Sequence, residues 1–108
     1  LREDGTLVMA DCGSFEDAQR AARAGVDIVS TTLAGYTGDR PKTDGPDLEL
    51  LREVVAAFPD VPVICEGRVH TPEQAAAAVE AGAFAVIVGT AITHPTSITT
   101  WFKAAVEG

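Results

Sequence analysis

The chain has 108 residues, enough for one domain, and 46% of them are hydrophobic, which favours a packed core over a disordered chain. A formal net charge of −8 argues against nucleic acid as a partner, because surfaces that bind it are basic. The negative net charge does not exclude an anionic substrate, since backbone N–H groups and one arginine can hold a phosphate locally.

No apolar run reaches the length of a membrane span, and no charged-then-apolar leader opens the sequence. We therefore expect no membrane partner and a cytoplasmic protein. The chain begins with Leu1, and residues 1–6 read as the end of a helix that feeds an apolar run. This start predicts a segment of a longer protein.

Apolar runs alternate with helix signals along the chain. The runs lie near 7–11, 27–32, 61–66 and 84–89, and they are continuously apolar, as in strands covered on both faces. Helices are predicted from the N-cap Ser14 to Gly25, from Asp47 through Phe58, from Thr71 to Gly82, and from about Thr96 to Val106. The inward face of the last helix is expected to carry Ile98, Trp101, Phe102 and Ala105. This order predicts an α/β fold with parallel strands in the spatial order 1-2-3-4.

An internal repeat supports this reading. Asp11 and Glu66 each end an apolar run and lie 55 residues apart, and the following Gly25 and Gly82 lie 57 apart. The repeat places both carboxylates at one end of a parallel sheet, the end that carries the chemistry in (β/α) barrels. Four such units make either a small open sheet or half of an eight-stranded barrel, and the rhythm favours the half-barrel.

The sequence gives little indication of disulfide, metal or serine-nucleophile chemistry. Cys12 and Cys65 are interpreted as free thiols, because a disulfide is improbable in a cytosolic chain. No set of His, Cys and carboxylates has metal-ligand spacing, and no serine nucleophile motif occurs, so we expect no metal and no cofactor. The connection from Leu33 to Pro46 follows the end of a strand, where functional loops of such folds occur.

Residue identities narrow the hypothesis. Five motifs occur in order: Ala10–Asp11, Ser30–Thr32, Gly35–Thr37, Glu66–Arg68 with Thr71–Pro72, and Val88–Thr93. Over essentially all 108 residues the series resembles the C-terminal half of the N-acetylmannosamine-6-phosphate 2-epimerase family. The resemblance implies one (β/α)4 segment, residues 1–108, that forms strands five to eight of a TIM (β/α)8 barrel. It also implies the isomerisation of N-acetylmannosamine 6-phosphate to N-acetylglucosamine 6-phosphate, a step of sialic acid catabolism, without a cofactor.

Epimerisation at carbon 2 removes a proton α to the C1 carbonyl and returns it to the other face, which requires a base and stabilisation of the enolate. Glu66 is the first candidate, at a strand tip and before a glycine; its alternative is pairing with Arg68 or capping the next helix. The resemblance favours Glu66, because the family's corresponding Glu is implicated in proton transfer. Asp11 is expected to orient the substrate or another catalytic group, with an N-cap or Asx-turn role as the alternative.

The phosphate is expected near Gly89 and Thr90, since barrels commonly bind phosphate after the last strands, with Gly67 and Arg68 in the neighbouring loop. The remaining substrate contacts predicted are Thr31, Thr32 and Tyr36, with strand formation and loop packing as their alternatives. His94 stands where relatives commonly show arginine and is interpreted as a surface turn residue, as is His70.

The family also uses a lysine from the first half of the barrel. The lysines here are Lys42 and Lys103, and neither ends a predicted strand. We therefore expect the partner to be a missing N-terminal half or a second copy, the isolated chain to be inactive, and the protein to be a homo-oligomer. Two alternatives stay open: another phosphate-binding barrel synthase, and a non-catalytic half-barrel that binds phosphate or self-associates.

Overall fold

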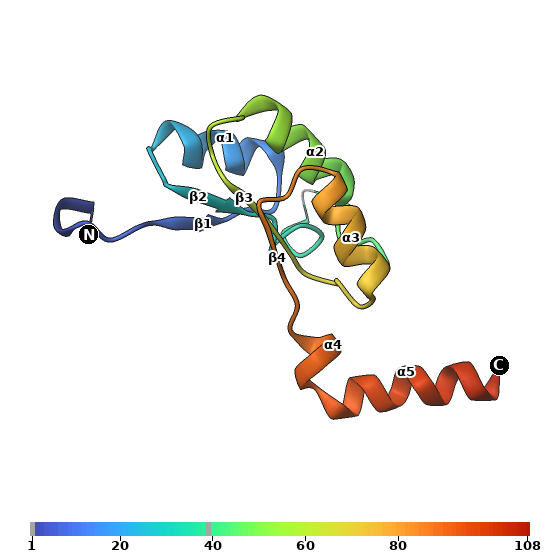
Figure 1. Ribbon diagram of the computed structural model, residues 1–108. Coiled ribbons are helices and arrows are strands. Elements are labelled where there is room, and N and C mark those ends of the chain that lie inside the picture. Colours follow the sequence, from blue (N-terminus) through green and yellow to red (C-terminus); the bar gives the residue numbers. More distant parts are fainter. Residues whose placement is uncertain (1, 39) are drawn as a thin grey trace.

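The computed structural model describes residues 2–38 and 40–108, and within them the strands form one parallel sheet (Figure 1). The strands are β1 (Met9–Asp11), β2 (Ile28–Ser30), β3 (Val63–Glu66) and β4 (Ala85–Ile87). Their spatial order is β1-β2-β3-β4, and every neighbouring pair is parallel. The predicted topology is confirmed, and each strand is shorter than its apolar run.

Helices follow the strands in the expected alternation. They are α1 (Phe15–Arg23), α2 (Leu48–Ala57), α3 (Pro72–Glu80), α4 (Thr90–Thr93) and α5 (Pro95–Glu107), after a 3₁₀ turn at Arg2–Asp4. Each of the first three starts where it was predicted to start, and the side chains of Ser14, Asp47 and Thr71 accept hydrogen bonds from backbone N–H groups of the first turn.

The internal repeat is also structural. Helices α1 and α3 end in the same way, because Gly25 and Gly82 adopt the left-handed conformation, with φ of 85° and 109°. The C-caps that precede them have almost identical dihedral angles, φ −75° and ψ −8° at Ala24 against φ −75° and ψ −6° at Ala81. The same chemistry therefore closes both helices, 57 residues apart in the sequence.

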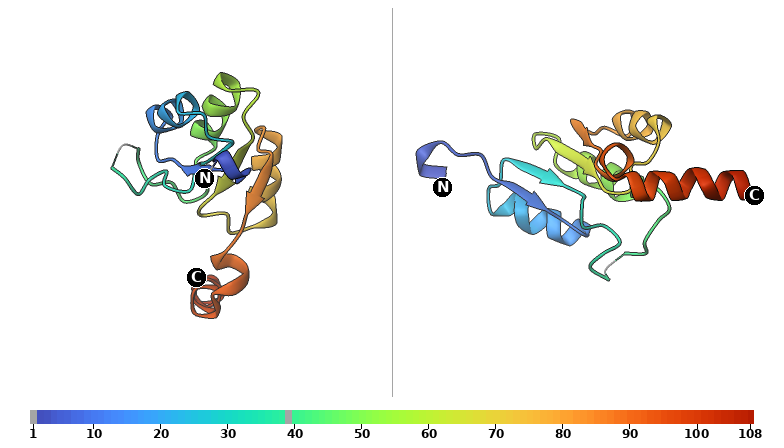
Figure 2. Two further views of the ribbon diagram at one scale, coloured as in Figure 1. Left: turned by 90° about the vertical axis from the view of Figure 1, so that its left-hand side faces the viewer. Right: turned by 90° about the horizontal axis from the view of Figure 1, so that it is seen from below.

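One face of the sheet is covered and the other is open. Helices α1, α2 and α3 lie side by side on the same face (Figures 1 and 2), where α2 contacts both of its neighbours. The core lies beneath them and includes Ala18, Val29, Leu50, Leu51, Val54, Val63, Cys65 and Ala78.

The strand register places Asp11 opposite Ser30 and Ser30 opposite Ile64, and side chains two residues apart on a strand share a face. Asp11 and Glu66 therefore both lie on the open face, at the carboxyl end of their strands.

The C-terminal helix differs from its prediction. After β4 the chain leaves the body, and α4 and α5 form an arm that extends away from the sheet (Figures 1 and 2). Phe102 is 70% exposed and Ala105 is also exposed, so their predicted inward packing is wrong. Ile98 and Trp101 are half-buried, and the centre of the Trp101 ring lies 4.4 Å from the centre of the His70 ring. Periodicity marks an apolar helix face but does not specify which surface covers it.

The arm and the N-terminal segment project from opposite sides of the body (Figures 1 and 2), and the chain has a longest dimension of 52 Å and a radius of gyration of 15.2 Å. A compact domain of this length has a radius of gyration of about 13 Å. Both cysteines are free and buried, as expected. No helix in the described part of the chain is long and apolar enough to cross a membrane.

Candidate functional site

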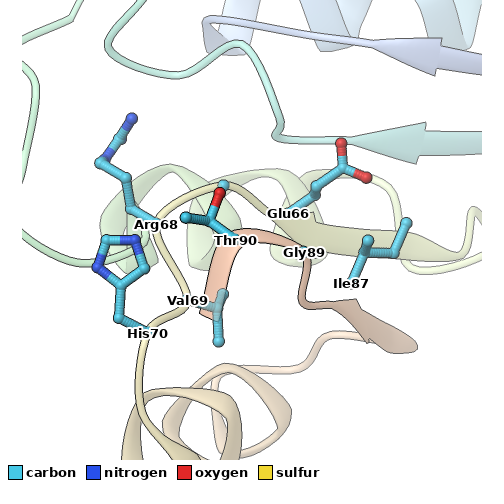
Figure 3. A pocket seen from close by; sticks show the side chains of 8 residues that line it. Glu66, Arg68, Val69, His70, Ile87, Gly89 and Thr90 are labelled. Carbon is cyan, nitrogen blue, oxygen red and sulfur yellow. The ribbon is translucent and has the colours of Figure 1, made fainter. Parts of the chain in front are cut away.

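A cavity of about 300 Å³ opens at the carboxyl ends of β3 and β4 (Figure 3). It is lined by Glu66, Gly67, Arg68, Val69, His70, Ile87, Gly89 and Thr90. Glu66 is the last residue of β3, and register pairs it with Ile87 of β4. Its side chain is half-buried. The predicted proton carrier and the predicted phosphate residues therefore surround one space, although the two loops that supply them lie more than 20 residues apart in the sequence.

Two glycines border this cavity for different reasons. Gly67 has φ of 102°, and a Cβ there would lie 3.4 Å from the carbonyl oxygen of Thr32, so backbone conformation accounts for the glycine. Gly89 has a negative φ of −114°, and a Cβ there would meet no atom within 4 Å. It precedes α4, in which the N–H groups of Ile92 and Thr93 donate to its carbonyl oxygen at 2.9 and 3.0 Å. The space beside the Gly89 Cα is therefore free of protein atoms.

Arg68 lines the cavity, but its guanidinium extends away from Glu66 (Figure 3). Nη2 donates to the carbonyl of Ala34 at 2.8 Å, and Nε donates to the carbonyl of Gly45 at 3.2 Å. Both acceptors belong to the long loop, residues 33–46, which the structure describes except for residue 39. The sequence places Arg68 beside the site, whereas only the structure shows that its donors point to this loop.

His70 has a larger role than that of a solvated turn residue. It is half-buried, lines the cavity and packs against Trp101. The Gln74 side chain accepts from the backbone N–H groups of His70 at 2.6 Å and of Thr71 at 3.1 Å, which completes the capping box of α3. The capping signal was readable in the sequence, but the Trp101 contact depends on where the arm lies. His94 is an exposed turn residue, as expected, and its Nδ1 accepts from the backbone of Ser97 at the start of α5.

The other predicted residues do not line this cavity. Asp11 is exposed at the end of β1, on the same sheet face as Glu66. Thr32 is half-buried beside Gly67, and Tyr36 is 55% exposed on the long loop.

Thr31 is 3% exposed and hydrogen-bonds to Cys65 on the helix-covered face of the sheet, opposite the face that carries Glu66. Thr31 directly follows β2 and its N–H donates to the carbonyl of Ile64, so its side chain lies on the same face as that of Val29.

Burial and charge shift several pKa values near the site. Burial raises the pKa of Cys12 to about 11, with the nearby Asp17 and Asp11 charges adding to the effect. Burial also raises the pKa of the Cys65 thiol, against the hydrogen bond from Thr31. Both thiols are therefore protonated at neutral pH and unsuited to nucleophilic chemistry.

Asp47 is held at the end of the long loop. Arg40 Nε donates to its carboxylate at 2.6 Å, and the N–H of Leu50 donates at 3.0 Å. Burial raises the pKa of Asp47, but the hydrogen bonds from Arg40 and Leu50 and the Arg40 and Arg68 charges outweigh burial, so the pKa lies below its usual value. Among the described residues, no cluster of three or more His, Cys, Asp or Glu side chains is placed to hold a metal ion.

Comparison with known proteins supports one family. The family model "Putative N-acetylmannosamine-6-phosphate epimerase" matches residues 1–108. The chain is 60% identical over 107 residues to the "Putative N-acetylmannosamine-6-phosphate 2-epimerase" of Cutibacterium acnes, covering 98% of this chain and 47% of that protein. It is 44% identical to the "Bifunctional enzyme NanE/NanK" of Brucella melitensis, covering 99% of this chain and 20% of that protein.

The solved structures agree with the sequences. The N-acetylmannosamine-6-phosphate 2-epimerase from Clostridium perfringens matches with a TM-score of 0.91 and 43% identity, over 96% of this chain and 45% of that one. FabK from Thermotoga maritima matches less well, with a TM-score of 0.66 and 28% identity over 84% of this chain and 28% of that one. The chain spans less than half the length of these relatives, and its fold is that of a partial (β/α) barrel.

Proposed function

Because the chain belongs to the N-acetylmannosamine-6-phosphate epimerase family, we propose that it is part of an amino-sugar phosphate 2-epimerase and forms strands five to eight of its barrel. The reaction interconverts N-acetylmannosamine 6-phosphate and N-acetylglucosamine 6-phosphate, in the cytoplasm. The other strands come from elsewhere in the protein or from a second copy and pair with the free edges of β1 and β4.

The observation that carries this proposal is the position of Glu66. Its carboxylate ends β3 on the open face of the sheet, in the wall of a cavity of about 300 Å³. In the open-chain sugar, Glu66 takes the proton from carbon 2, the electron pair moves towards the C1 carbonyl, and an enolate forms. Return of a proton to the opposite face of carbon 2 inverts that centre. The second proton carrier is a lysine supplied from outside these residues.

The other predicted contacts arrange the substrate around Glu66. Asp11 shares its sheet face and orients the sugar, while Thr32 and Tyr36 contact the sugar from the neighbouring strand end and loop. The phosphate lies by the backbone N–H groups of Gly67, Gly89 and Thr90, because these residues line the cavity beside Glu66 and the space beside Gly89 is open. In this arrangement the Arg68 guanidinium binds the long loop and not the phosphate.

Glu66→Gln tests the proposal, because the amide keeps the shape of the side chain but does not act as a base near neutral pH. In the enzyme that carries this segment, we expect exchange of the carbon 2 proton with heavy water to fall by at least about a hundredfold, within the range for loss of a general base. Proton NMR of the sugar phosphate follows the exchange, and the affinity for inorganic phosphate should change little.

The matched control is Glu80→Gln, at the exposed end of α3, which removes the same charge outside the cavity. It should leave exchange unchanged. Undiminished exchange in Glu66→Gln would remove this residue from the mechanism, whereas absence of exchange in the parent enzyme would overturn the proposed reaction.

A further inference from the structure

Arg68 joins the two ends of the long loop. It lies in the β3–α3 connection, and its Nη2 reaches Ala34 near the start of the loop, while Nε reaches Gly45 near the end. Nη2 also lies 3.5 Å from the hydroxyl of Thr43. These contacts bridge 23 to 34 residues of sequence, so one guanidinium sets the separation of both loop ends.

The same guanidinium supports Tyr36. Its Cζ atom lies 4.9 Å from the centre of the Tyr36 ring, and the Nζ atom of Lys42 lies 5.1 Å from it. Cations at this distance from an aromatic ring are attracted by its quadrupole. Arg68 also lines the cavity, whereas Tyr36 does not, so one arginine side chain contacts both the cavity and an aromatic residue of the loop.

The backbone of Arg68 has a strained conformation in this arrangement. Arg68 has φ of 59°, and it is the non-glycine residue with positive φ in the described part of the chain. Its Nη1 atom is buried and has no hydrogen-bond partner among the described residues. A left-handed arginine and an unpaired buried donor each cost free energy, and such costs concentrate at functional sites.

Gly35 shows how closely the parts fit. With φ of 86°, it sits where a Cβ would lie 2.9 Å from the Cα of Lys42 and 3.1 Å from Nη2 of Arg68. Gly38, in the same loop, has φ of 85°, but a Cβ there would meet nothing within 4 Å. The two glycines share a conformation and differ in contact, which makes them a matched pair for experiment.

From these contacts we propose that Arg68 is a positioning residue that ties the ends of the long loop together and holds Tyr36 against its guanidinium, rather than a ligand of the phosphate. The loop then forms a wall beside the bound sugar phosphate. The substrate part of this inference rests on the proposed function, whereas the part that concerns the loop does not.

The loop is tested by limited proteolysis. Trypsin cleavage after Lys42, followed by mass spectrometry, should accelerate by about tenfold or more in Arg68→Ala, because cleavage tracks the population of the open loop. Arg68→Lys should accelerate it similarly, since one ammonium does not reproduce the fork that reaches two carbonyls. Cleavage after Arg20, within α1, reports global unfolding and should stay unchanged.

The glycine pair gives the control that leaves Arg68 intact. Gly35→Ala should accelerate cleavage after Lys42 as Arg68→Ala does, whereas Gly38→Ala should stay within about twofold of the parent. Unchanged cleavage in Arg68→Ala would overturn the inference, as would equal acceleration after Lys42 and Arg20. This readout needs no substrate, so its failure is distinct from failure of the proposed reaction.

A double-mutant cycle tests the link to the substrate in the enzyme that carries this segment. If Arg68 acts through the loop, the KM of Arg68→Ala plus Tyr36→Ala should be close to that of the worse single variant, because the two changes remove one contact. Fully additive effects, with Arg68→Lys retaining affinity for sugar phosphate, would instead assign Arg68 to the phosphate and overturn the positioning role.

Discussion

At the scale of single residues, the two glycines of the candidate phosphate site differ in what they allow. Gly67 is required by its backbone conformation, with a positive φ of 102°. Gly89 has no such constraint, since its φ is negative and its surroundings are open. A Cβ at position 89 would therefore meet no protein atom within 4 Å.

We predict that Gly89→Ala leaves the fold intact and weakens binding of the sugar phosphate by about tenfold or more, the scale of one lost charged hydrogen bond. The added methyl group would occupy the space that the proposed function assigns to the phosphate. Calorimetry with the phosphorylated and the unphosphorylated sugar measures the effect, and the unphosphorylated sugar should bind as before. A lower melting temperature with equal losses for both ligands would show that Gly89 serves folding.

At the scale of elements, Asp47 connects the start of α2 to the long loop. Its carboxylate caps the helix through the N–H of Leu50 and pairs with Arg40, while its side chain is 5% exposed. Removing the charge on this carboxylate would therefore weaken the helix start and the end of the loop together.

The lowered pKa of Asp47 predicts a specific loss of stability in acid. Its contribution is fully present above the unfolded-state pKa of about 3.9 and is lost as the pH falls through the lower folded-state value. Asp47→Asn keeps a helix cap but lacks this contribution, so the difference between parent and variant in the free energy of unfolding should shrink from pH 7 to pH 3. Urea denaturation measures it. Exposed Asp60→Asn is the control, and a difference independent of pH would contradict the prediction.

At the scale of the whole molecule, the sheet is open on one face and at both edges. In the described chain β1 and β4 each pair on one side only, and the open face exposes Met9 at 44% and Ile87 at 38%. Unpaired parallel edges beside an apolar face favour association with another chain.

We therefore predict that a polypeptide of residues 1–108 forms dimers or larger species at micromolar concentration, measured by analytical ultracentrifugation. It should also show no epimerase activity, because neither Lys42 nor Lys103 ends a strand. Met9→Lys combined with Ile87→Lys should shift the population towards monomer, because inward-pointing charges oppose edge pairing. A monodisperse parent monomer, or turnover by this polypeptide, would contradict the half-barrel assignment.

Local chemistry in the sequence determined the parts of this fold that depend on neighbouring residues. The caps at Ser14 and Thr71, the stops at Gly25 and Gly82, and the repeat that brings Asp11 and Glu66 to one sheet end could all be predicted. Each depends on hydrogen bonds or backbone conformations within a few residues, and parallel order follows from the alternation of strands and helices.

Tertiary structure alone decided where side chains with several possible partners point. Thr31 hydrogen-bonds to Cys65, and the Arg68 guanidinium donates to the long loop. Helix α5 extends away from the sheet, so that Phe102 on its apolar face is exposed. The sequence allows the Thr31 side chain on either face of the sheet. It also allows the Arg68 guanidinium to bind either a phosphate or the loop carbonyls, and the apolar face of α5 to pack on any apolar surface. These choices depend on contacts between segments far apart in the chain, because only their packing fixes which partner comes within reach.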